Sequence, residues 1–376
     1  MSGGVDSSVV AGLLHEAGHE VIGVTLQLYD HGVATGRKGS CCAGQDIHDA
    51  RRVADRLGIA HYVIDAEDRF ARAVIADFAD SYAAGQTPIP CVRCNQTVKF
   101  TDLTALARGL DAERLATGHY VRRVDGPGGA ELHRAADPAR DQSWFLFATT
   151  QAQLDFCLFP LGGMPDKRVV RDVADRLGLA VADKPDSQDI CFVPTGTYMD
   201  VVGKLRPDAL EAGEIVNADG DVLGRHDGIA RYTVGQGKRL GPAAMVAGER
   251  QIVIATEPGR RRIVVGPRGS GTRTVRLREV NWLVAPPADG LRCTVKLRAR
   301  DSQHPALVRV SEGSASGSAE VLLDEPALPA PGQACVFYDG DRVLGGGFIR
   351  GSEVGGRGGG GLVSPAPPKD GGVAQR

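Results

Sequence analysis

The chain has 376 residues, of which 42% are hydrophobic and 24% charged, and its formal net charge is −2. This length exceeds one typical core and favours two or three domains of an ordinary globular protein. The chain has no apolar run of membrane-spanning length and no signal-peptide pattern at its start, so we expect a cytoplasmic protein. A net charge this close to zero leaves any nucleic-acid binding to local basic patches.

Glycines and serines stand directly before an apolar helix in SGGVDSS, residues 2–8. Glycines allow backbone N–H groups to approach an oxyanion, serine hydroxyls add donors, and the helix dipole points its positive end to the same place. A glycine turn with a serine N-cap is the alternative. The following helix and the strand-like EVIGVTLQL complete half of a βαβ unit, which favours a phosphate site. The loop lacks the GK[ST] ending of the Walker loop and resembles the PP-loop of the ATP pyrophosphatase superfamily.

Strand-like and helix-like segments alternate up to residue 203. HEVIGVTLQLYD, AHYVIDAED and ERLATGHYVRR predict strands, and DIHDARRVADRLGI, RFARAVIADFADSYAAG and TVKFTDLTALARGL predict helices. This alternation predicts an α/β fold with a doubly wound, Rossmann-like parallel sheet. A strand precedes the phosphate loop in such folds, but this chain starts at Met1, so we expect the first strand to be missing.

Short strands and glycine turns follow from residue 204. GEIVNADGDVLGRHDG and RQIVIATEPGRRRIVVG predict two hairpins of a small β-rich central domain at 204–271. Strand-like segments between 272 and 350 predict a C-terminal antiparallel β-barrel. The Gly- and Pro-rich stretch 351–376 predicts a disordered tail. We therefore expect a catalytic domain at 1–203 followed by two modules that bind the substrate.

The eight cysteines are scattered, which favours chemistry or burial over a disulfide framework. Cys91 and Cys94 form a C-x-x-C pair, but the second pair that a four-thiolate zinc site needs is absent. Because Cys94 stands near a helix N-terminus beside Arg93, we expect its thiol pKa to be lowered. Burial of both cysteines in a turn is the alternative.

The other cysteines near polar segments are Cys191, Cys41 and Cys42. Cys191 follows the polar run from Asp186 to Asp189, which is poor core material. Cys41 and Cys42 stand at the entrance of a helix and have no matched role. Of these three, Cys191 is therefore the candidate for chemistry.

Eight motifs carry a resemblance to a known family: SGGVDSS, C..CN..VKF, LATGHY, DQSWFL, FPLG, DSQDICF, YTVGQ and PGQACVFYDGD.VLGGG. From Met1 to Ile349 the chain is similar to tRNA 2-thiouridylases, which replace the C2 oxygen of the wobble uridine by sulfur. The resemblance implies an ATP-dependent sulfurtransferase that uses Mg²⁺, acts on tRNA and receives sulfur from a persulfide-carrying donor protein. It implies neither a membrane partner nor DNA.

The resemblance also assigns roles to single residues. ATP would be bound by Met1, Ser2, Gly3, Gly4, Val5, Asp6, Ser7, Leu26 and Gly118, with Asp6 also contacting Mg²⁺. The tRNA would be contacted by Ile89, Pro90, Cys91, His119, Arg140, Asp141, Gln142, Arg298, Ala299, Arg300 and Gln333. A core position for Leu26, a strand cap for His119 and a solvated strand face for the barrel arginines are the alternatives.

Several positions depart from the family pattern. Arg140 replaces a lysine, which keeps a cation but changes its geometry. Ala299 replaces an aromatic residue that could stack on RNA. Gly237 stands where an arginine is expected after Gln236, and Arg239 is a nearby substitute.

The implied mechanism explains why two thiols and ATP are needed. Adenylation turns the C2 oxygen of uracil into a leaving group. A persulfide on Cys191 then attacks C2, and the thiolate of Cys94 attacks the Cys191 sulfur, which releases the thiolated base and leaves a transient Cys94–Cys191 disulfide. With Cys91 as a third thiolate, an iron–sulfur cluster is a less favoured alternative.

Two other functions fit parts of the sequence. Another adenylating PP-loop enzyme, such as an amidotransferase or ligase, would share the phosphate loop but would not need the placed cysteines. A non-catalytic RNA-binding relative would keep the fold without turnover. ATP–pyrophosphate exchange in the presence of tRNA separates both enzymes from the RNA-binding protein.

Overall fold

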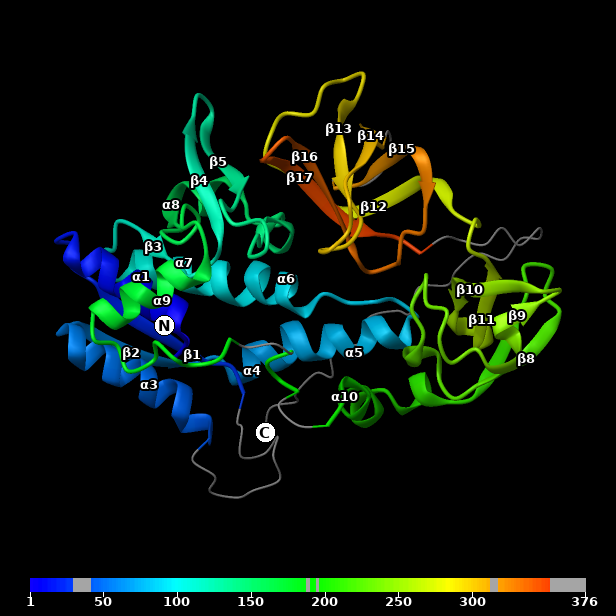
Figure 1. The fold of residues 1–376 in the computed structure, drawn as a ribbon, viewed down its shortest axis with the longest axis horizontal. Coiled ribbons are helices and arrows are strands. Elements are labelled where there is room, and N and C mark those ends of the chain that lie inside the picture. The colour runs from blue at the N-terminus through cyan, green and yellow to red at the C-terminus, as the bar shows by residue number, and fades with distance from the viewer. Residues whose placement is uncertain (30–41, 187–189, 194–195, 312–316, 352–376) are drawn as a thin grey trace, which may run out of the picture.

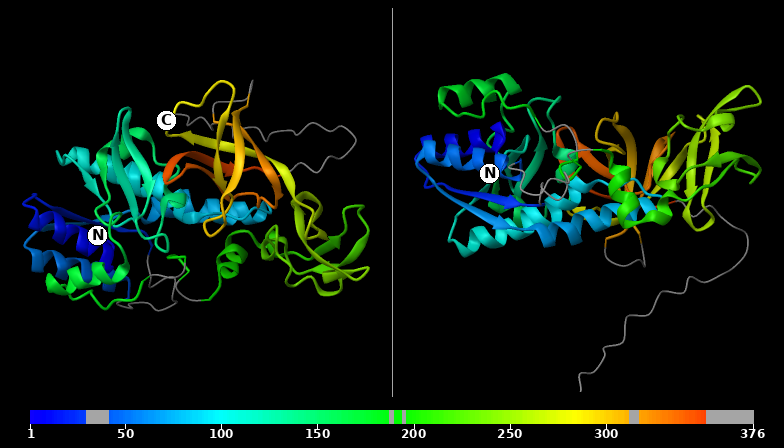
Figure 2. Two further views of the ribbon diagram at one scale, coloured as in Figure 1. Left: turned by 45° about the horizontal axis from the view of Figure 1, so that its top comes forward. Right: turned by 90° about the horizontal axis from the view of Figure 1, so that it is seen from below.

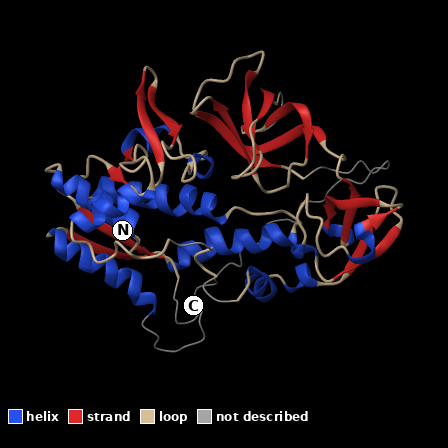
Figure 3. Cartoon of the chain, viewed as in Figure 1, coloured by secondary structure: helices blue, strands red, loops and turns tan. Residues whose placement is uncertain are grey.

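The computed structural model describes residues 1–29, 42–186, 190–193, 196–311 and 317–351 (Figure 1). The predictions for Cys41, for residues 187–189 and for the tail from 352 to 376 lie outside the described residues. Helices gather in the N-terminal part, and strands dominate the central part and the C-terminal part (Figure 3).

The N-terminal part has the predicted alternation of strands and helices. Its helices are α1 (Val5–Glu16), α3 (Cys42–Leu57), α4 (Glu67–Phe70), α5 (Ala76–Ala83), α6 (Pro90–Cys94), α7 (Phe100–Gly109), α8 (Gln151–Phe156), α9 (Lys167–Arg176) and α10 (Tyr198–Leu205). Its strands are β1 (Ile22–Gln27), β2 (Ala60–Asp65), β3 (Leu115–Ala116), β4 (Val121–Gly126), β5 (Gly129–Arg134) and β6 (Cys157–Leu158). Of the motif LATGHY, only Leu115 and Ala116 are in a strand, because the chain then leaves β3 for the antiparallel hairpin β4–β5, which joins the sheet of the C-terminal part.

The parallel strands form two pairs. β1 pairs with β2 and β3 pairs with β6, both in parallel. Among the described residues β1 pairs with no strand other than β2, while the nitrogen of Met1 donates to the carbonyl oxygen of Val24 and the Oγ1 of Thr25 donates to the carbonyl of Met1 at 2.7 Å. The parallel α/β architecture is confirmed, and Met1 holds the phosphate loop beside β1.

Two segments of the helical layer are π-helices. Residues Ala71–Ile75 (η1) lie between α4 and α5, and residues Asn95–Lys99 (η2) lie between α6 and α7. The wider π turn changes which side chains share a face, and such turns are frequent at functional sites. The segment η2 begins directly after Cys94, so Lys99 stands one π turn beyond the thiol.

The central part is a five-stranded sheet of order β8-β7-β11-β10-β9. Its strands are β7 (Gly213–Val216), β8 (Val222–His226), β9 (Met245–Val246), β10 (Glu249–Glu257) and β11 (Arg262–Pro267). Both predicted hairpins, β7–β8 and β10–β11, are antiparallel as expected. The side chain of Asn217 closes the first hairpin by accepting hydrogen bonds from the N–H groups of Asp219 and Asp221.

The C-terminal part is the predicted antiparallel barrel. Its strands are β12 (Thr272–Trp282), β13 (Leu291–Lys296), β14 (His304–Val310), β15 (Ala319–Ala327), β16 (Ala334–Asp339) and β17 (Arg342–Ile349). They follow the order β12-β15-β14-β13-β16-β17, and pairing of β12 with β17 closes the barrel. Closure removes the open sheet edges that an isolated sheet would expose.

A shared core holds the barrel on the N-terminal part. Val92 of α6, Phe100 of α7 and Leu132 of β5 are buried in one cluster with Val336 and Tyr338 of β16. The barrel and the β4–β5 hairpin lie above helices that run across the middle of the molecule (Figures 1 and 2). Contacts on this scale hold the barrel at a defined position relative to the phosphate loop.

Candidate active site

The phosphate loop leads into α1 without a side-chain cap. Gly4 is the extended N-cap residue, and the first hydrogen bond along the helix runs from the N–H of Ser8 to the carbonyl of Gly4. The N–H groups of Val5, Asp6 and Ser7 therefore have no acceptor within the helix. Gly3 has φ +70°, and a Cβ there would lie 2.2 Å from the carbonyl oxygen of Asp46. The predicted anion site thus has uncapped donors and a position that only glycine can occupy.

Asp6 is held by two partners that the sequence did not reveal. The Nζ of Lys167, at the start of α9, and the hydroxyl of Tyr120 each lie 2.6 Å from Oδ1 of Asp6. A Cβ on Gly118 would lie 3.0 Å from the nitrogen of Ser7, so that glycine packs directly against the start of α1. Tyr120 and Gly118 therefore both contact the first turn of α1.

Lys184 ties the phosphate loop to the segment that leads to Cys191. Its Nζ donates to the carbonyl of Gly3 at 3.0 Å and lies 2.7 Å from Asp46 and 2.6 Å from Asp49. Burial alone would lower the pKa of Lys184, but the hydrogen bonds that its ammonium group donates to the two carboxylates outweigh burial and raise that pKa. Lys184 is therefore charged at neutral pH.

Asp186 extends this network of charges. It lies 2.6 Å from Arg140 and 3.0 Å from Lys167, the lysine that also contacts Asp6. Burial would raise the pKa of Asp186, but the hydrogen bonds from Lys167 and Arg140 outweigh burial and lower it. Arg140, predicted to contact tRNA, is thus placed beside the phosphate loop.

The two candidate thiols converge on one apolar cluster. Cys94, Leu26 and Phe192 pack together there, and Phe192 follows Cys191 directly in the chain. The ring of Phe192 contacts the rings of Phe70 and Phe78, with centroids 5.8 and 5.2 Å away. Leu26 is thus a partly buried core residue at the end of β1, and Phe192 anchors Cys191 near Cys94.

The predicted lowering of the Cys94 pKa is wrong. Burial raises that pKa, with Lys99 opposing the shift. The guanidinium of Arg93 points elsewhere, since it contacts Glu279 and Asp77 and lies over the ring of Phe348. Cys94 does lie in the first turns of the helical run formed by α6, η2 and α7, as the sequence predicts. Desolvation therefore outweighs the local helix effect.

We expect the reactivity of Cys191 to rise steeply with pH. Cys191 is exposed at one side, but the surrounding protein atoms desolvate its sulfur and, with smaller contributions from Cys94 and Cys91, raise the pKa of the thiol to about 11. Between pH 7 and pH 9 the thiolate fraction should therefore rise about tenfold per pH unit. The measurement is the iodoacetamide alkylation rate of Cys191, followed by peptide mass spectrometry. A rate that levels off near pH 8 would contradict this environment for the thiol.

The other predicted tRNA contacts are scattered. Ile89 is buried in the core shared with the barrel, while Cys91 is exposed. His119 hydrogen-bonds to Thr117 at 2.9 Å, and burial lowers the pKa of His119 to about 3, so the ring is neutral. Asp141 accepts hydrogen bonds from Ser143 and Ala135.

Three of the remaining residues predicted to contact tRNA make hydrogen bonds within the protein. Gln142 accepts a hydrogen bond from the N–H of Tyr120. The Nε2 of Gln333 donates to the carbonyl of Thr87 at 3.1 Å. Arg298 donates to the carbonyls of Val234 and Leu328, at 2.9 and 3.3 Å. Arg300 is exposed, Ala299 packs against the shared core, and Pro90 begins α6.

Sequence reasoning assigned no role to Lys167, Lys184 or Tyr120. Two signals were present: Lys167 follows the N-cap Asp166 at the start of a helix, and Lys184 stands just before the acidic run that leads to Cys191. Neither signal identifies the carboxylate partner, which comes from a distant segment. No group of three His, Cys, Asp or Glu side chains within the described ranges is arranged to hold a metal ion.

Three family models together match most of the chain. They are described as the tRNA methyl transferase HUP domain at residues 1–195, the tRNA methyl transferase PRC-barrel domain at 200–267 and the aminomethyltransferase beta-barrel domain at 272–349. These matches agree with the α/β part, the central sheet and the closed barrel. In the part of the chain that is described, no helix is both long and apolar enough to cross a membrane.

Curated relatives match nearly the whole chain. The tRNA-specific 2-thiouridylase MnmA of Acidiphilium cryptum is 69% identical over 93% of this chain and 98% of its own length. The proteins of the same name from Gluconobacter oxydans and Rhodospirillum centenum are 63% and 62% identical, each over 93% of this chain and over 97% and 90% of their own lengths. The phosphate loop, the paired thiols and this similarity agree: the chain belongs to the family of tRNA-specific 2-thiouridylases.

Proposed function

We propose that this protein is an ATP-dependent sulfurtransferase that 2-thiolates the wobble uridine of tRNA. The observation that carries the proposal is the convergence of Cys94 and the Cys191 segment on one cluster, tied by Lys184 to the phosphate loop. Adenylation and sulfur attack must occur on the same base, so an anion site and two thiols are needed within one cavity. We assign catalysis to the N-terminal part, residues 1–203, and tRNA binding mainly to the central part, 204–271, and the barrel, 272–350.

The phosphate loop is suited to the pyrophosphate part of the substrate ATP. The free N–H groups of Val5, Asp6 and Ser7 and the cations Lys167 and Lys184 can neutralise phosphate oxygens. Mg²⁺ bound there would add charge neutralisation during adenylation. Asp6 fits such an ion through Oδ2, since both of its close partners contact Oδ1.

The thiols supply the sulfur chemistry. We assign the persulfide to the exposed Cys191, because a donor protein must reach it, and the resolving thiolate to the buried Cys94. Lys99 stands one π turn beyond Cys94, where its positive charge favours the thiolate. The word methyl transferase in two family descriptions suggests a different reaction. A methyl transfer needs neither ATP cleavage nor a resolving thiol.

The test is reconstitution with purified protein, ATP, a tRNA transcript and a persulfide donor. Nucleoside mass spectrometry should detect 2-thiouridine, and AMP should form in equal amount. AMP without 2-thiouridine would support another adenylating enzyme, and tRNA binding without AMP would support a non-catalytic RNA-binding protein. Wild-type protein treated with iodoacetamide is the matched control for the thiol steps.

We expect Arg298→Ala and Arg300→Ala to have different effects. Arg298 bonds the carbonyls of Val234 and Leu328, so its loss should reduce stability by about 1–3 kcal/mol, measured by urea unfolding. Arg300 is exposed and pairs with no described carboxylate. Its loss should leave stability unchanged and flatten the salt dependence of tRNA binding by about 0.7–0.9 in slope. Equal effects of both variants on tRNA binding and on stability would contradict these roles.

A further inference from the structure

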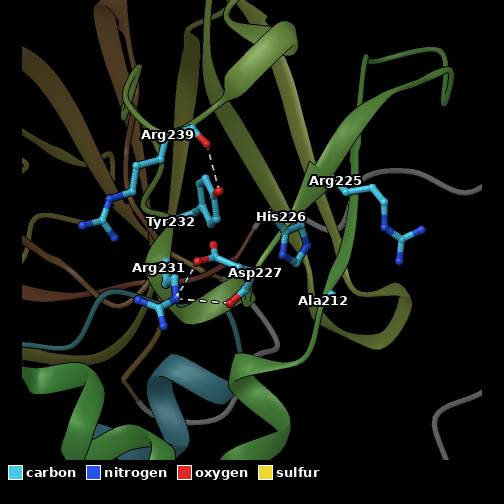
Figure 4. A pocket seen from close by; sticks show the side chains of 7 residues that line it. All are labelled: Ala212, Arg225, His226, Asp227, Arg231, Tyr232 and Arg239. Atoms are coloured by element: carbon cyan, nitrogen blue, oxygen red, sulfur yellow. Dashed lines mark hydrogen bonds and ion pairs between the residues drawn. The ribbon is translucent and has the colours of Figure 1, made fainter.

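Two adjoining hollows lie where the central sheet meets α10. One, of about 580 Å³, is lined by Arg225, Asp227 and Tyr232, and the other, of about 320 Å³, by Thr197 and Lys238. Arg231 and Arg239 line both hollows and form their common wall. In Figure 4 the guanidinium groups of Arg231 and Arg239 lie on one side of the larger hollow, and that of Arg225 lies on the other side of His226. We call the two hollows together the arginine groove.

The arginine groove is positively charged. Four cationic side chains line it, and its acidic lining residue, Asp227, pairs with Arg231 at 3.3 Å. No carboxylate of the described residues pairs with Arg225, Lys238 or Arg239, and all three are exposed. His226 adds no charge, because burial lowers its pKa and its Nδ1 accepts a hydrogen bond from the N–H of Gly228. The groove therefore has unneutralised positive charge at neutral pH.

The backbone of Arg239 is strained and locked. Its φ is +66°, a left-handed value that is unfavourable for a residue with a Cβ. The hydroxyl of Tyr232 donates to the carbonyl of Arg239 at 3.0 Å, and the Nε2 of Gln236 donates to the carbonyl of Lys238 at 3.0 Å. Strain that is held by such bonds frequently marks a functional position. Here the two hydrogen bonds hold the backbone of Lys238 and Arg239 so that both cations stay at the edge of the groove.

The groove begins close to the reactive thiol along the chain. Thr197, Tyr198 and Met199, which line the smaller hollow, follow Cys191 by six to eight residues. A nucleotide whose base reaches Cys191 continues into a sugar-phosphate chain, which must leave across a neighbouring surface. A planar guanidinium group can donate two parallel hydrogen bonds to two oxygens of one phosphate, so arginines are suited to bind that chain.

We propose that the arginine groove binds the tRNA sugar-phosphate backbone next to the target nucleotide, with Arg225, Lys238 and Arg239 contacting phosphates. The proposal rests on the proposed function, because it takes tRNA as the substrate at Cys191. An acidic protein that delivers sulfur is the competing occupant. The centre of a protein interface needs apolar side chains that are free to be covered, and lysine is depleted there. In this groove the apolar lining residues Tyr232 and Met199 are already buried, and one of the exposed cations is Lys238.

The experiment measures tRNA affinity over a salt series from about 50 to about 200 mM for Arg225→Gln, Arg239→Gln and the double variant. Arg231 stays unchanged because it pairs with Asp227. Each single variant should flatten the slope of log affinity against log salt by about 0.7–0.9, and the double variant by about twice as much. The KM for tRNA should rise while kcat for AMP formation at saturating tRNA stays the same. Arg239→Lys keeps a cation and should restore the wild-type slope.

Matched controls are Arg250→Gln and Arg268→Gln, exposed cations of the same domain that do not line the groove. They should leave the slope unchanged, and an equal loss in them would overturn the proposal. Wild-type slopes for the groove variants would also overturn it. A third outcome would also overturn the proposal: the groove variants bind tRNA normally but thiolate it more slowly, and they do so only when a protein donates the sulfur. That result would assign the groove to the donor protein. If wild-type protein neither binds tRNA nor forms 2-thiouridine in the same assay, the proposed function itself fails.

Discussion

Cys191→Ser is expected to abolish 2-thiouridine formation, with a loss of at least about 10³-fold, while AMP formation continues. The serine hydroxyl cannot carry a persulfide, but in the proposed mechanism adenylation of the base precedes sulfur attack and depends on the phosphate loop. The measurement compares 2-thiouridine by nucleoside mass spectrometry with AMP by chromatography in the same reaction. The variant should therefore uncouple ATP consumption from sulfur transfer.

The control for this prediction is Cys293→Ser. Cys293 lies in β13 of the barrel, where burial raises its pKa to about 12 and keeps the thiol protonated. Its variant should thiolate tRNA at the wild-type rate. If Cys191→Ser lost AMP formation but still bound tRNA, Cys191 would act before or during adenylation, and the proposed order of steps would be wrong.

Asp6→Asn should suppress AMP formation by about 10²–10³-fold and leave tRNA affinity unchanged. Asp6 accepts hydrogen bonds from Lys167 and Tyr120 at the start of α1, where the phosphate loop begins the helix. The amide keeps the shape of the side chain but removes the negative charge that orients Lys167 and that a bound Mg²⁺ would need. AMP formation at saturating ATP and tRNA affinity in a salt series are the two measurements.

Glu16→Gln provides the matched control at the other end of α1. Glu16 pairs with Arg176 on the surface, far along the helix from the phosphate loop. The same loss of charge there should change neither AMP formation nor tRNA binding. Normal AMP formation by Asp6→Asn would contradict this role. The carboxylate would then serve only to stabilise the first turn of α1, and Lys167 would not need it for phosphate binding.

The charge network suggests how the two halves of the reaction are linked. Lys167 contacts both Asp6 and Asp186, and Lys184 contacts the phosphate loop at Gly3. Lys184 stands seven residues before Cys191, and Lys167 reaches the same segment through its contact with Asp186. A change in the phosphate loop on ATP binding would therefore be felt by the residues that position this thiol.

Local patterns in the sequence determined much of this protein. The spacing of apolar and β-branched residues was enough to place β1, β2, both central hairpins and the barrel strands, because strand and helix periodicities are properties of neighbouring residues. The glycines and serines of SGGVDSS likewise indicated an anion site, since donors and the helix dipole come from the same short segment.

Only the tertiary structure decided the chemistry of individual side chains. The Cys94 pKa is raised rather than lowered because residues from distant segments desolvate the thiol, and Arg93 turns to Glu279, which is 186 positions away. Arg298 bonds carbonyls of another part of the chain, and Asp6 is held by a lysine 161 positions later. Desolvation and ion pairing depend on which groups come together in space, and a pattern of neighbouring residues does not contain that information.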